Sequence, residues 1–185
     1  MLIIYSHPNK IGHCGYILQK VREELDRRAQ RYQILDLYEM KYDPILKQEE
    51  LYSAGQKQVS PENFKIQELI KNEDKFIFIY PTWWSSMPAI LKGFIDRVMV
   101  SGFAFKYVNG MPVGLLKGKA AIFTSTGSPN FVNLIVRPTK YFSNNVLRFC
   151  GIKSKGFIVG NALRFEEGKK IIIEKTVRKG ISYLI

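Results

Sequence analysis

Small polar residues, glycines and aromatic residues gather in three short segments of the chain. The segments read SHPNKIGHCGY (6–16), PTWWSSMP (81–88) and STGSPNF (125–131). Small side chains let backbone N–H groups approach a ligand closely. The first segment also leads into the start of a helix, where free N–H groups and the helix dipole favour a phosphate. Together the three segments favour a ligand site, whereas the first segment alone is more typical of a plain strand-to-helix turn with exposed histidines.

The only two tryptophans of the chain, Trp83 and Trp84, are adjacent and lie in the second segment. A tryptophan is usually placed where its ring packs and its N–H finds a partner. Because adjacent side chains rarely both point inward, we expect one of the two rings to face the mouth of the site. The alternative is that both rings simply cover the core.

Apolar runs and amphipathic segments alternate along the whole chain. This pattern shows where the three segments lie relative to the predicted strands and helices. The apolar runs predict strands at 2–6, 32–37, 75–80, 119–125 and 156–161. Helical periodicity predicts helices at 13–29, 88–100, 138–149 and 166–184, and a further helix starting at Ser60-Pro61, while 39–60, with Pro44 and Gly55, is loop-like. The pattern indicates an α/β protein, one domain over 1–185, with a parallel sheet covered on both faces. In such a sheet ligands bind beyond the carboxyl ends of the strands, where all three segments fall.

Composition excludes several classes of protein. No apolar run approaches the ~18 residues of a membrane span, and the first ten residues lack the basic start of a signal peptide. Two cysteines without metal-ligand spacing argue against a disulfide scaffold or a zinc site and favour a cytoplasmic setting. Neither GxGxxG nor GxSxG occurs, so a Rossmann dinucleotide site and a hydrolase elbow are not expected.

The net charge of +12 is concentrated in the C-terminal part of the chain. Residues 1–100 hold 14 Lys and Arg against 13 Asp and Glu, whereas residues 101–185 hold 14 against 3. Such a field favours anionic partners, among them nucleotide phosphates, nucleic acid or an acidic membrane face. A lysine-rich, solubilising surface explains the same charge equally well.

One long pattern resembles a known family. The stretch PxxWxxxPAILKGFxxRV (81–98), followed by GFAF (102–105), is similar to the signature of the NAD(P)H:quinone oxidoreductase (DT-diaphorase) family of flavodoxin-fold flavoproteins. The motifs YSHP (5–8), DLY (36–38), TG (126–127) and RFCGI (148–152) follow in the matching order. The length resembles that of the bacterial members. The resemblance implies a three-layer, flavodoxin-like fold with a five-stranded sheet in the order 2-1-3-4-5.

The resemblance also implies a cofactor, a reaction and a set of site residues. Hydride would pass from NAD(P)H to bound FMN, with FAD as the alternative, and then to a quinone or similar acceptor in a ping-pong sequence. The implied flavin-binding residues are His7, His13, Cys14, Gly15, Pro81, Thr82, Trp83, Trp84, Ser125, Thr126, Gly127 and Ser128. Phe105 and Tyr107 match aromatic residues that close over the flavin of the second subunit in a homodimer. No metal and no nucleic-acid partner is implied.

The sequence departs from the family pattern at two places. Gly12 and Cys14 or Gly15 stand where the phosphate loop usually offers Ser or Thr and Asn, so phosphate binding would depend on backbone N–H groups, His13 and the helix dipole. The Tyr and His that follow the Thr-Gly loop in the quinone reductases have no match, and Asn133 and Tyr141 are poor substitutes by spacing. We therefore assign no catalytic acid or base.

Two alternative functions stay open at this point. One is an ancillary flavoprotein subunit of a membrane transporter, which the basic C-terminal part would suit through peripheral membrane or transporter association. The other is a flavodoxin-like electron carrier, which the positive charge disfavours because such carriers dock basic partners.

Overall fold

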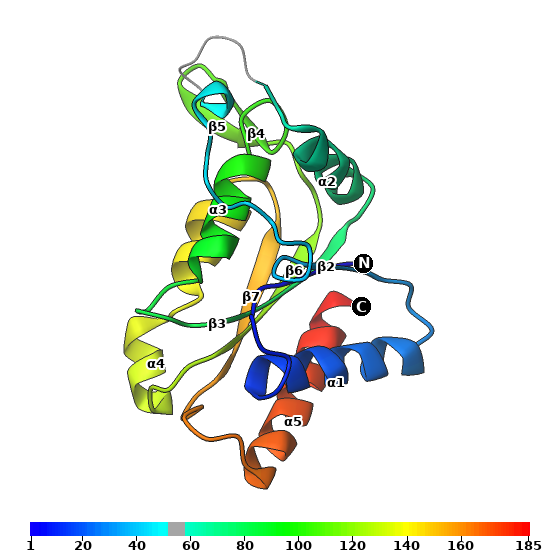
Figure 1. Ribbon diagram of the computed structural model, residues 1–185, viewed down its shortest axis with the longest axis vertical. Coiled ribbons are helices and arrows are strands. Elements are labelled where there is room, and N and C mark those ends of the chain that lie inside the picture. Colours follow the sequence, from blue (N-terminus) through cyan, green and yellow to red (C-terminus); the bar gives the residue numbers. More distant parts are fainter. Residues whose placement is uncertain (52–57) are drawn as a thin grey trace.

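A computed structural model describes residues 1–51 and 58–185, so Gly55 of the expected loop lies outside the described residues. Five parallel strands form the central sheet: β1 (Leu2–Tyr5), β2 (Gln33–Asp36), β3 (Lys75–Pro81), β6 (Lys119–Ser125) and β7 (Lys153–Val159). Their order is β2-β1-β3-β6-β7 (Figure 1), which confirms the predicted flavodoxin-like order. The inner strands are buried on both faces, as their continuous apolar sequences require.

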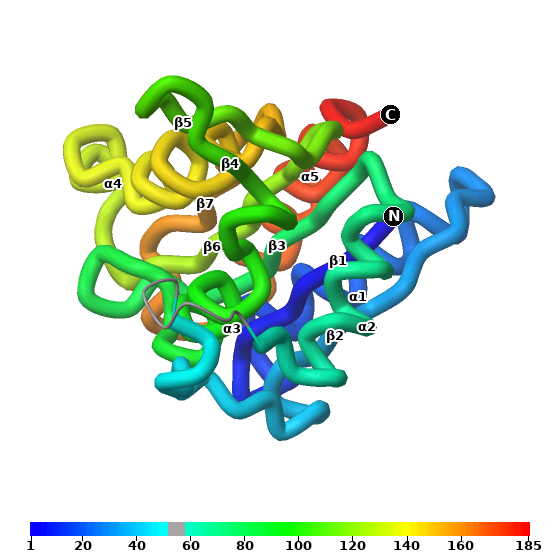
Figure 2. Tube along the Cα trace, turned by 90° about the horizontal axis from the view of Figure 1, so that it is seen from above, coloured from blue at the N-terminus to red at the C-terminus, as the bar shows by residue number. Residues whose placement is uncertain are grey.

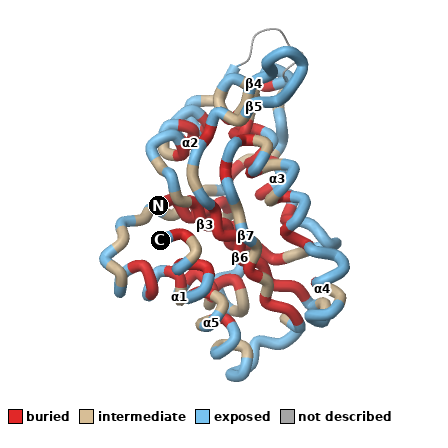
Figure 3. The backbone as a smooth tube through the Cα atoms, turned by 180° about the vertical axis from the view of Figure 1, so that it is seen from behind, coloured by how far each residue is buried: buried red, intermediate tan, exposed pale blue. Residues whose placement is uncertain are grey.

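Helices cover both faces of the sheet and give the fold three layers. α1 (His13–Arg27) and α5 (Glu167–Leu184) pack on one face, against the side chains of Ile77 and Ile79. α2 (Pro61–Lys71) and α3 (Ala89–Val98) lie on the other face (Figure 3). There they belong to the same core cluster as Phe76 and Phe78. The alternation of side chains along β3 therefore divides the core into two halves.

The start of α2 follows the predicted capping chemistry. The side chain of Ser60 accepts a hydrogen bond from the backbone N–H of Asn63, and Pro61 occupies the first turn, where it needs no N–H partner. A short 3₁₀ turn, η1 (Gln48–Glu50), precedes it in the described part of the 39–60 segment.

The predicted helix over 138–149 is wrong in extent. The structure has two pieces, α4 (Asn130–Val136) and a π-helical segment, η3 (Phe142–Leu147). Pro138 disfavours helical geometry at the residue before it, and Arg137 ends α4 in the left-handed region with a φ of 47°. Most other elements differ from the predicted bounds by one to three residues at an end; for example, the last strand spans 153–159 rather than 156–161, and α3 spans 89–98 rather than about 88–100.

A β-hairpin follows α3, which the sequence patterns did not predict. Its strands are β4 (Phe105–Val108) and β5 (Met111–Gly114), joined by Asn109 and Gly110, both with positive φ. Asn-Gly is the preferred pair for a two-residue hairpin turn. Because α3 runs back toward the amino ends of the strands, the hairpin projects from the end opposite to the three loops (Figures 1 and 2).

Candidate cofactor and substrate site

The three predicted loops meet at the carboxyl edge of the sheet. The backbone N–H of Thr82 donates to the carbonyl of Ser125 over 2.8 Å, which joins the second loop to the third. The Cys14 sulfur lies 3.2 Å from the Ser125 hydroxyl, which joins the first loop to the third. The rings of His7 and Trp83, with centroids 6.0 Å apart, join the first loop to the second. These contacts form one continuous site surface.

The start of α1 offers unpaired donors. Gly12 precedes the helix with a φ of 119°, and no side chain caps the first turn. The first intrahelical bond runs from the N–H of Tyr16 to the carbonyl of Gly12, over 2.9 Å, so the preceding N–H groups point out of the helix. The hydroxyl of Ser6 and Nε2 of His13 are buried, and neither has a hydrogen-bond partner among the described residues. Orphaned polar atoms at a helix start suit an anion such as a flavin phosphate.

The resemblance implies four flavin-phosphate residues, and the three of them that lie in α1 differ in their surroundings. His13 packs edge-on against Phe165, with ring centroids 5.2 Å apart, and partial burial lowers the pKa of its imidazole. Cys14 is buried, and that burial raises the pKa of its thiol to about 11. Gly15 leaves no room for a side chain, because a Cβ there would overlap the backbone of Lys10. The Cys14 thiol and the missing side chain at Gly15 thus offer a phosphate no charged group, so only the backbone N–H groups of the first turn could bind it here.

The tryptophan loop is a tight two-residue turn. Trp83 and Ser86 exchange both backbone hydrogen bonds at 2.9 Å, with Trp84 and Ser85 between them at φ values of 50° and 61°. The Trp84 side chain is 100% exposed and that of Trp83 is 43% exposed, so the two rings do not cover the core. A positive φ is rare and strained for a bulky residue.

Few backbone donors of the second and third loops stay available for a ligand. Bonds within the protein use the N–H groups of Thr82 and Trp83, and Pro81 has none. The Thr126 N–H donates to Val159, and the Ser128 N–H donates to the Thr126 hydroxyl over 3.2 Å. N–H groups without a bond to any residue that the structure describes include those of Trp84, Ser85 and Gly127, and also those of Met87, Asn130 and Phe131.

Asn133 and Tyr141, the poor substitutes for the missing Tyr and His, lie in different surroundings. Asn133 is buried, and its side-chain amide donates to the carbonyl of Ser128 over 3.1 Å, which holds the third loop. Tyr141 is exposed and lines a small cavity together with Lys140 and Ser85 of the tryptophan turn. Among the described residues, no group of three His, Cys, Asp or Glu side chains could hold a metal ion.

The structure does not bring Phe105 and Tyr107 to the three loops. They line a cavity of about 580 Å³ between α3, the hairpin and η3. Phe149, which sequence reasoning missed, lies in the same cavity, with its ring centroid 4.8 Å from that of Phe105. Phe149 belongs to the RFCGI motif (148–152), so its match to the family could have marked it as a site residue. These aromatic rings can meet the loops only if a second subunit supplies them.

Comparison with known proteins agrees with this geometry. A family model described as "Flavodoxin-like fold" matches residues 1–181. An uncharacterized NAD(P)H oxidoreductase of Haemophilus influenzae is 31% identical over 193 residues, covering 96% of this chain and 92% of the relative. A ribosyldihydronicotinamide dehydrogenase [quinone] of Rattus norvegicus is 28% identical, with 97% and 89% covered. The structure of an NAD(P)H:quinone oxidoreductase from Methanothermobacter marburgensis superposes with a TM-score of 0.85 at 25% identity, over 98% and 95%.

The fold and the carboxyl-edge site thus define a flavodoxin-like protein. The chain belongs to that family, and the resemblance to the quinone oxidoreductase type of enzyme is confirmed. No helix in the described part of the chain is long and apolar enough to span a membrane.

Proposed function

We propose that the protein is an FMN-dependent NAD(P)H oxidoreductase that reduces quinones or similar acceptors. The observation that carries the proposal is the set of unpaired donors where the three loops meet: Ser6, His13 and the start of α1 at one end, and the N–H groups of Trp84, Ser85 and Gly127 at the other. The donors around the start of α1 suit a phosphate, and the N–H groups of Trp84, Ser85 and Gly127 suit the polar edge of a flavin ring. The names of the relatives support the donor and the acceptor.

In this proposal each of the three loops would bind a different part of the flavin. The start of α1, with His7 and His13 beside it, would hold the phosphate end, and Pro81–Trp84 would lie along the ring. Ser125–Ser128 would cover its pyrimidine side. Bound FMN would supply the hydride-accepting ring, and donor and acceptor would use the same cleft in turn, in a ping-pong sequence.

The chain's own contribution to the reaction is electrostatic. Negative charge develops on the pyrimidine side of a reduced flavin, and preorganised N–H donors stabilise such charge without reorganisation. The N–H of Gly127 is the free donor there, at the start of a region that has nine Lys or Arg and no Asp or Glu between residues 101 and 165. No side-chain acid or base is required for this role.

A two-fold homodimer would complete the site. The subunit exposes apolar residues at two opposite ends: Tyr107 and Met111 on the hairpin, and Leu134 and Ile135 on α4, all at least 55% exposed. Large exposed apolar surfaces of this kind usually mark interfaces. In a two-fold dimer one patch meets the other twice, so each hairpin can cover the partner's α4 and loops.

The proposal includes a cytoplasmic location, which the NAD(P)H donor and the two free, buried cysteines favour.

Purification followed by mass measurement of the released flavin tests the cofactor. A steady-state assay with NADPH or NADH and a soluble benzoquinone tests the reaction. We expect FMN and turnover by the isolated protein. Activity only in the presence of a transporter membrane would favour the ancillary subunit, and a flavin-loaded protein that oxidises no nicotinamide donor would favour the electron carrier.

A further inference from the structure

A second cavity lies beside the tryptophan turn. It has a volume of about 300 Å³ and is lined by Ser85 of the turn together with Arg137, Lys140, Tyr141, Asn144 and Asn145. Two cations and several neutral hydrogen-bonding groups line it, and no carboxylate does. Because Ser85 belongs to the loop that would carry the flavin ring, this basic pocket lies beside the place where the nicotinamide would stack in the proposed function.

The positive charge of the basic pocket is uncompensated. Neither Arg137 nor Lys140 forms an ion pair with any residue of 1–51 or 58–185, and no Asp or Glu occurs between residues 101 and 165. Some cations elsewhere are paired, such as Lys10 with Asp36 and Glu39, while other exposed lysines, such as Lys117, form no ion pair with a described residue. Two unpaired cations at one cavity create a local field that attracts an anion.

The backbone around Arg137 restricts where its side chain can go. Arg137 has a φ of 47°, and its Nε donates to the carbonyl of Leu134 over 3.1 Å. That bond caps the last turn of α4, which is a structural role, but it uses only one of the five guanidinium donors. The two terminal nitrogens stay free to form the paired hydrogen bonds that guanidinium groups make with phosphate.

We propose that the basic pocket binds the phosphate groups of the dinucleotide donor, and that Arg137 and Lys140 thereby select NADPH or NADH over a donor without phosphate. The inference rests on the proposed function. It addresses a difference that the relatives raise, since one of them is named for ribosyldihydronicotinamide, a nicotinamide nucleoside that has no phosphate. Two charged contacts to phosphate are the feature that would separate the two kinds of donor.

The test compares three donors on the flavin-loaded protein: NADPH, NADH and dihydronicotinamide riboside, with one benzoquinone as acceptor. The variants are Arg137→Ala, Lys140→Ala and the double substitution. Since a hydrogen bond to a charged group contributes enough to change affinity about tenfold or more, we expect the double variant to lose about ten- to a hundredfold in kcat/KM with the dinucleotides. With the riboside it should stay within about twofold of wild type.

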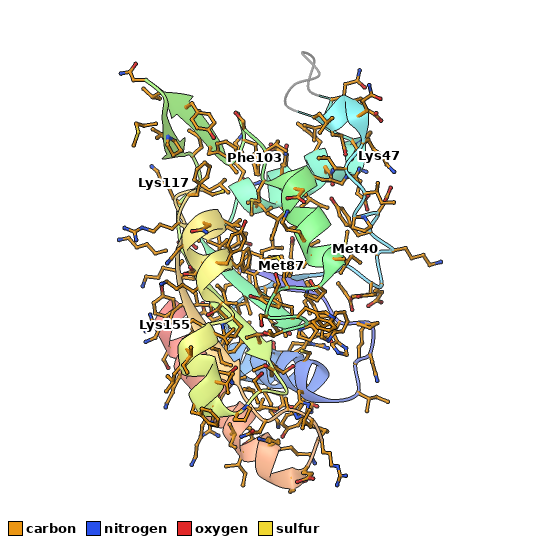
Figure 4. All side chains as sticks on the ribbon, turned by 90° about the vertical axis from the view of Figure 1, so that its left-hand side faces the viewer. Met40, Lys47, Met87, Phe103, Lys117 and Lys155 are labelled. Atoms are coloured by element: carbon orange, nitrogen blue, oxygen red, sulfur yellow. The ribbon has the colours of Figure 1, made fainter. Side chains whose placement is uncertain are left out.

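The control is Lys117→Ala, which removes the same charge from an exposed residue at the hairpin end of the molecule (Figure 4). It should change none of the three kcat/KM values. Arg137→Lys, which keeps the charge, should recover part of the loss. Calorimetric titration with NADP⁺ adds a readout without turnover, and the double variant should bind it at least about tenfold more weakly.

The outcomes separate this inference from the proposed function. An equal loss with the riboside, or an equal loss in Lys117→Ala, would overturn the inference and leave the oxidoreductase intact. A wild-type protein that turns over none of the donors would overturn the proposed function. In that case NADP⁺ binding that depends on Arg137 and Lys140 still supports a phosphate site, and binding that ignores both residues contradicts it.

Discussion

The imidazole of His7 lies against the indole of Trp83, with ring centroids 6.0 Å apart and ring planes at 54°. The imidazole is itself held in place, because the backbone N–H of Asn9 donates to its Nδ1 over 3.0 Å. His7 therefore links the loop after β1 to the tryptophan turn, two segments that bind opposite ends of the flavin in the proposed function.

Substituting His7→Ala should weaken flavin retention about tenfold, because it removes both the contact with Trp83 and a polar group near the phosphate end. His7→Phe keeps an aromatic ring against Trp83 and should recover part of the loss. The measurement is the flavin-to-protein ratio after gel filtration, with a fluorescence titration of the flavin-free protein. Unchanged flavin content in His7→Ala would remove His7 from the site.

The backbone strain at Trp84 and Ser85 should lower the free energy of unfolding, while the same two residues contribute to flavin binding. Both residues have the positive φ that a two-residue turn requires, and Asn-Gly is the pair that adopts it most easily. Replacing Trp84→Asn and Ser85→Gly together should raise the free energy of unfolding by about 2 kcal/mol or more, since each strained residue costs about 1–3 kcal/mol and the change relieves two. The same change should weaken flavin binding. Urea unfolding of the flavin-free protein and a flavin titration measure the two effects, and a less stable variant would show that Trp84 is not strained.

A buried ion pair secures the segment before α2. Arg97 of α3 donates to both carboxylate oxygens of Glu50, over 2.7 and 2.8 Å, and also to the carbonyl of Asp43. Arg97→Met leaves the Glu50 carboxylate buried without its partner, and should lower the free energy of unfolding by about 3–5 kcal/mol. Adding Glu50→Met should recover much of this loss. Additive losses in the double variant, measured by urea unfolding, would mean that the two side chains act independently.

The same pair predicts how stability depends on pH. The hydrogen bonds from Arg97 are the main cause of the lowered pKa of Glu50. A depressed pKa in the folded state stabilises the protein fully above the unfolded-state value of about 4.3, and this contribution is lost as the pH falls through the folded-state value. Arg97→Met should therefore flatten the acid limb of the stability curve below about pH 4. An unchanged acid limb would mean that carboxylates other than Glu50 cause the loss of stability at low pH.

Both cysteines should be inert in the native protein. Burial raises the pKa of the Cys14 and Cys150 thiols to about 11 each, so about one molecule in a thousand carries a thiolate at pH 8. Neither should react with an aromatic disulfide reagent at that pH, and both should react after unfolding in urea. Rapid labelling of the folded protein at one of the two would contradict its buried placement.

Periodicity in the sequence predicted the parallel sheet and the loops that meet at its edge, because buried parallel strands leave a continuous apolar signal. The strand order followed from the family resemblance. Periodicity did not predict the elements whose apolar side chains point to solvent instead of into the core. Phe131, Leu134 and Ile135 of α4 face outward, so the helix has no inward apolar stripe to detect. The Asn109-Gly110 pair is typical of a hairpin turn. It was overlooked because the prediction for this region rested on the helical pattern that precedes it.

Contacts between the loops were also beyond prediction. Cys14 and Ser125 meet although 111 positions separate them, and only their residue types, not their hydrogen bond, are visible in the sequence. The same holds for the basic pocket, where Ser85 meets Arg137 and Lys140 across the fold.

The homodimer is the remaining prediction, and it depends on two exposed residues at opposite ends of the subunit. Ile135 of α4 is 80% exposed and Met111 of the hairpin is 69% exposed. Because neither side chain is buried in the monomer, Ile135→Glu or Met111→Glu should leave the subunit folded and break the interface. Ile171→Glu, at a half-exposed residue of α5, is the matched control and should keep the dimer.

Sedimentation at several protein and salt concentrations measures the association. Two subunits that each carry most of their +12 charge after residue 100 repel one another, so the dimer should tighten as salt screens that repulsion. Turnover should fall with dissociation, because the aromatic rings of Phe105 and Tyr107 reach the flavin loops only from the partner. A fully active, flavin-loaded monomer at every concentration would contradict both the dimer and the shared site.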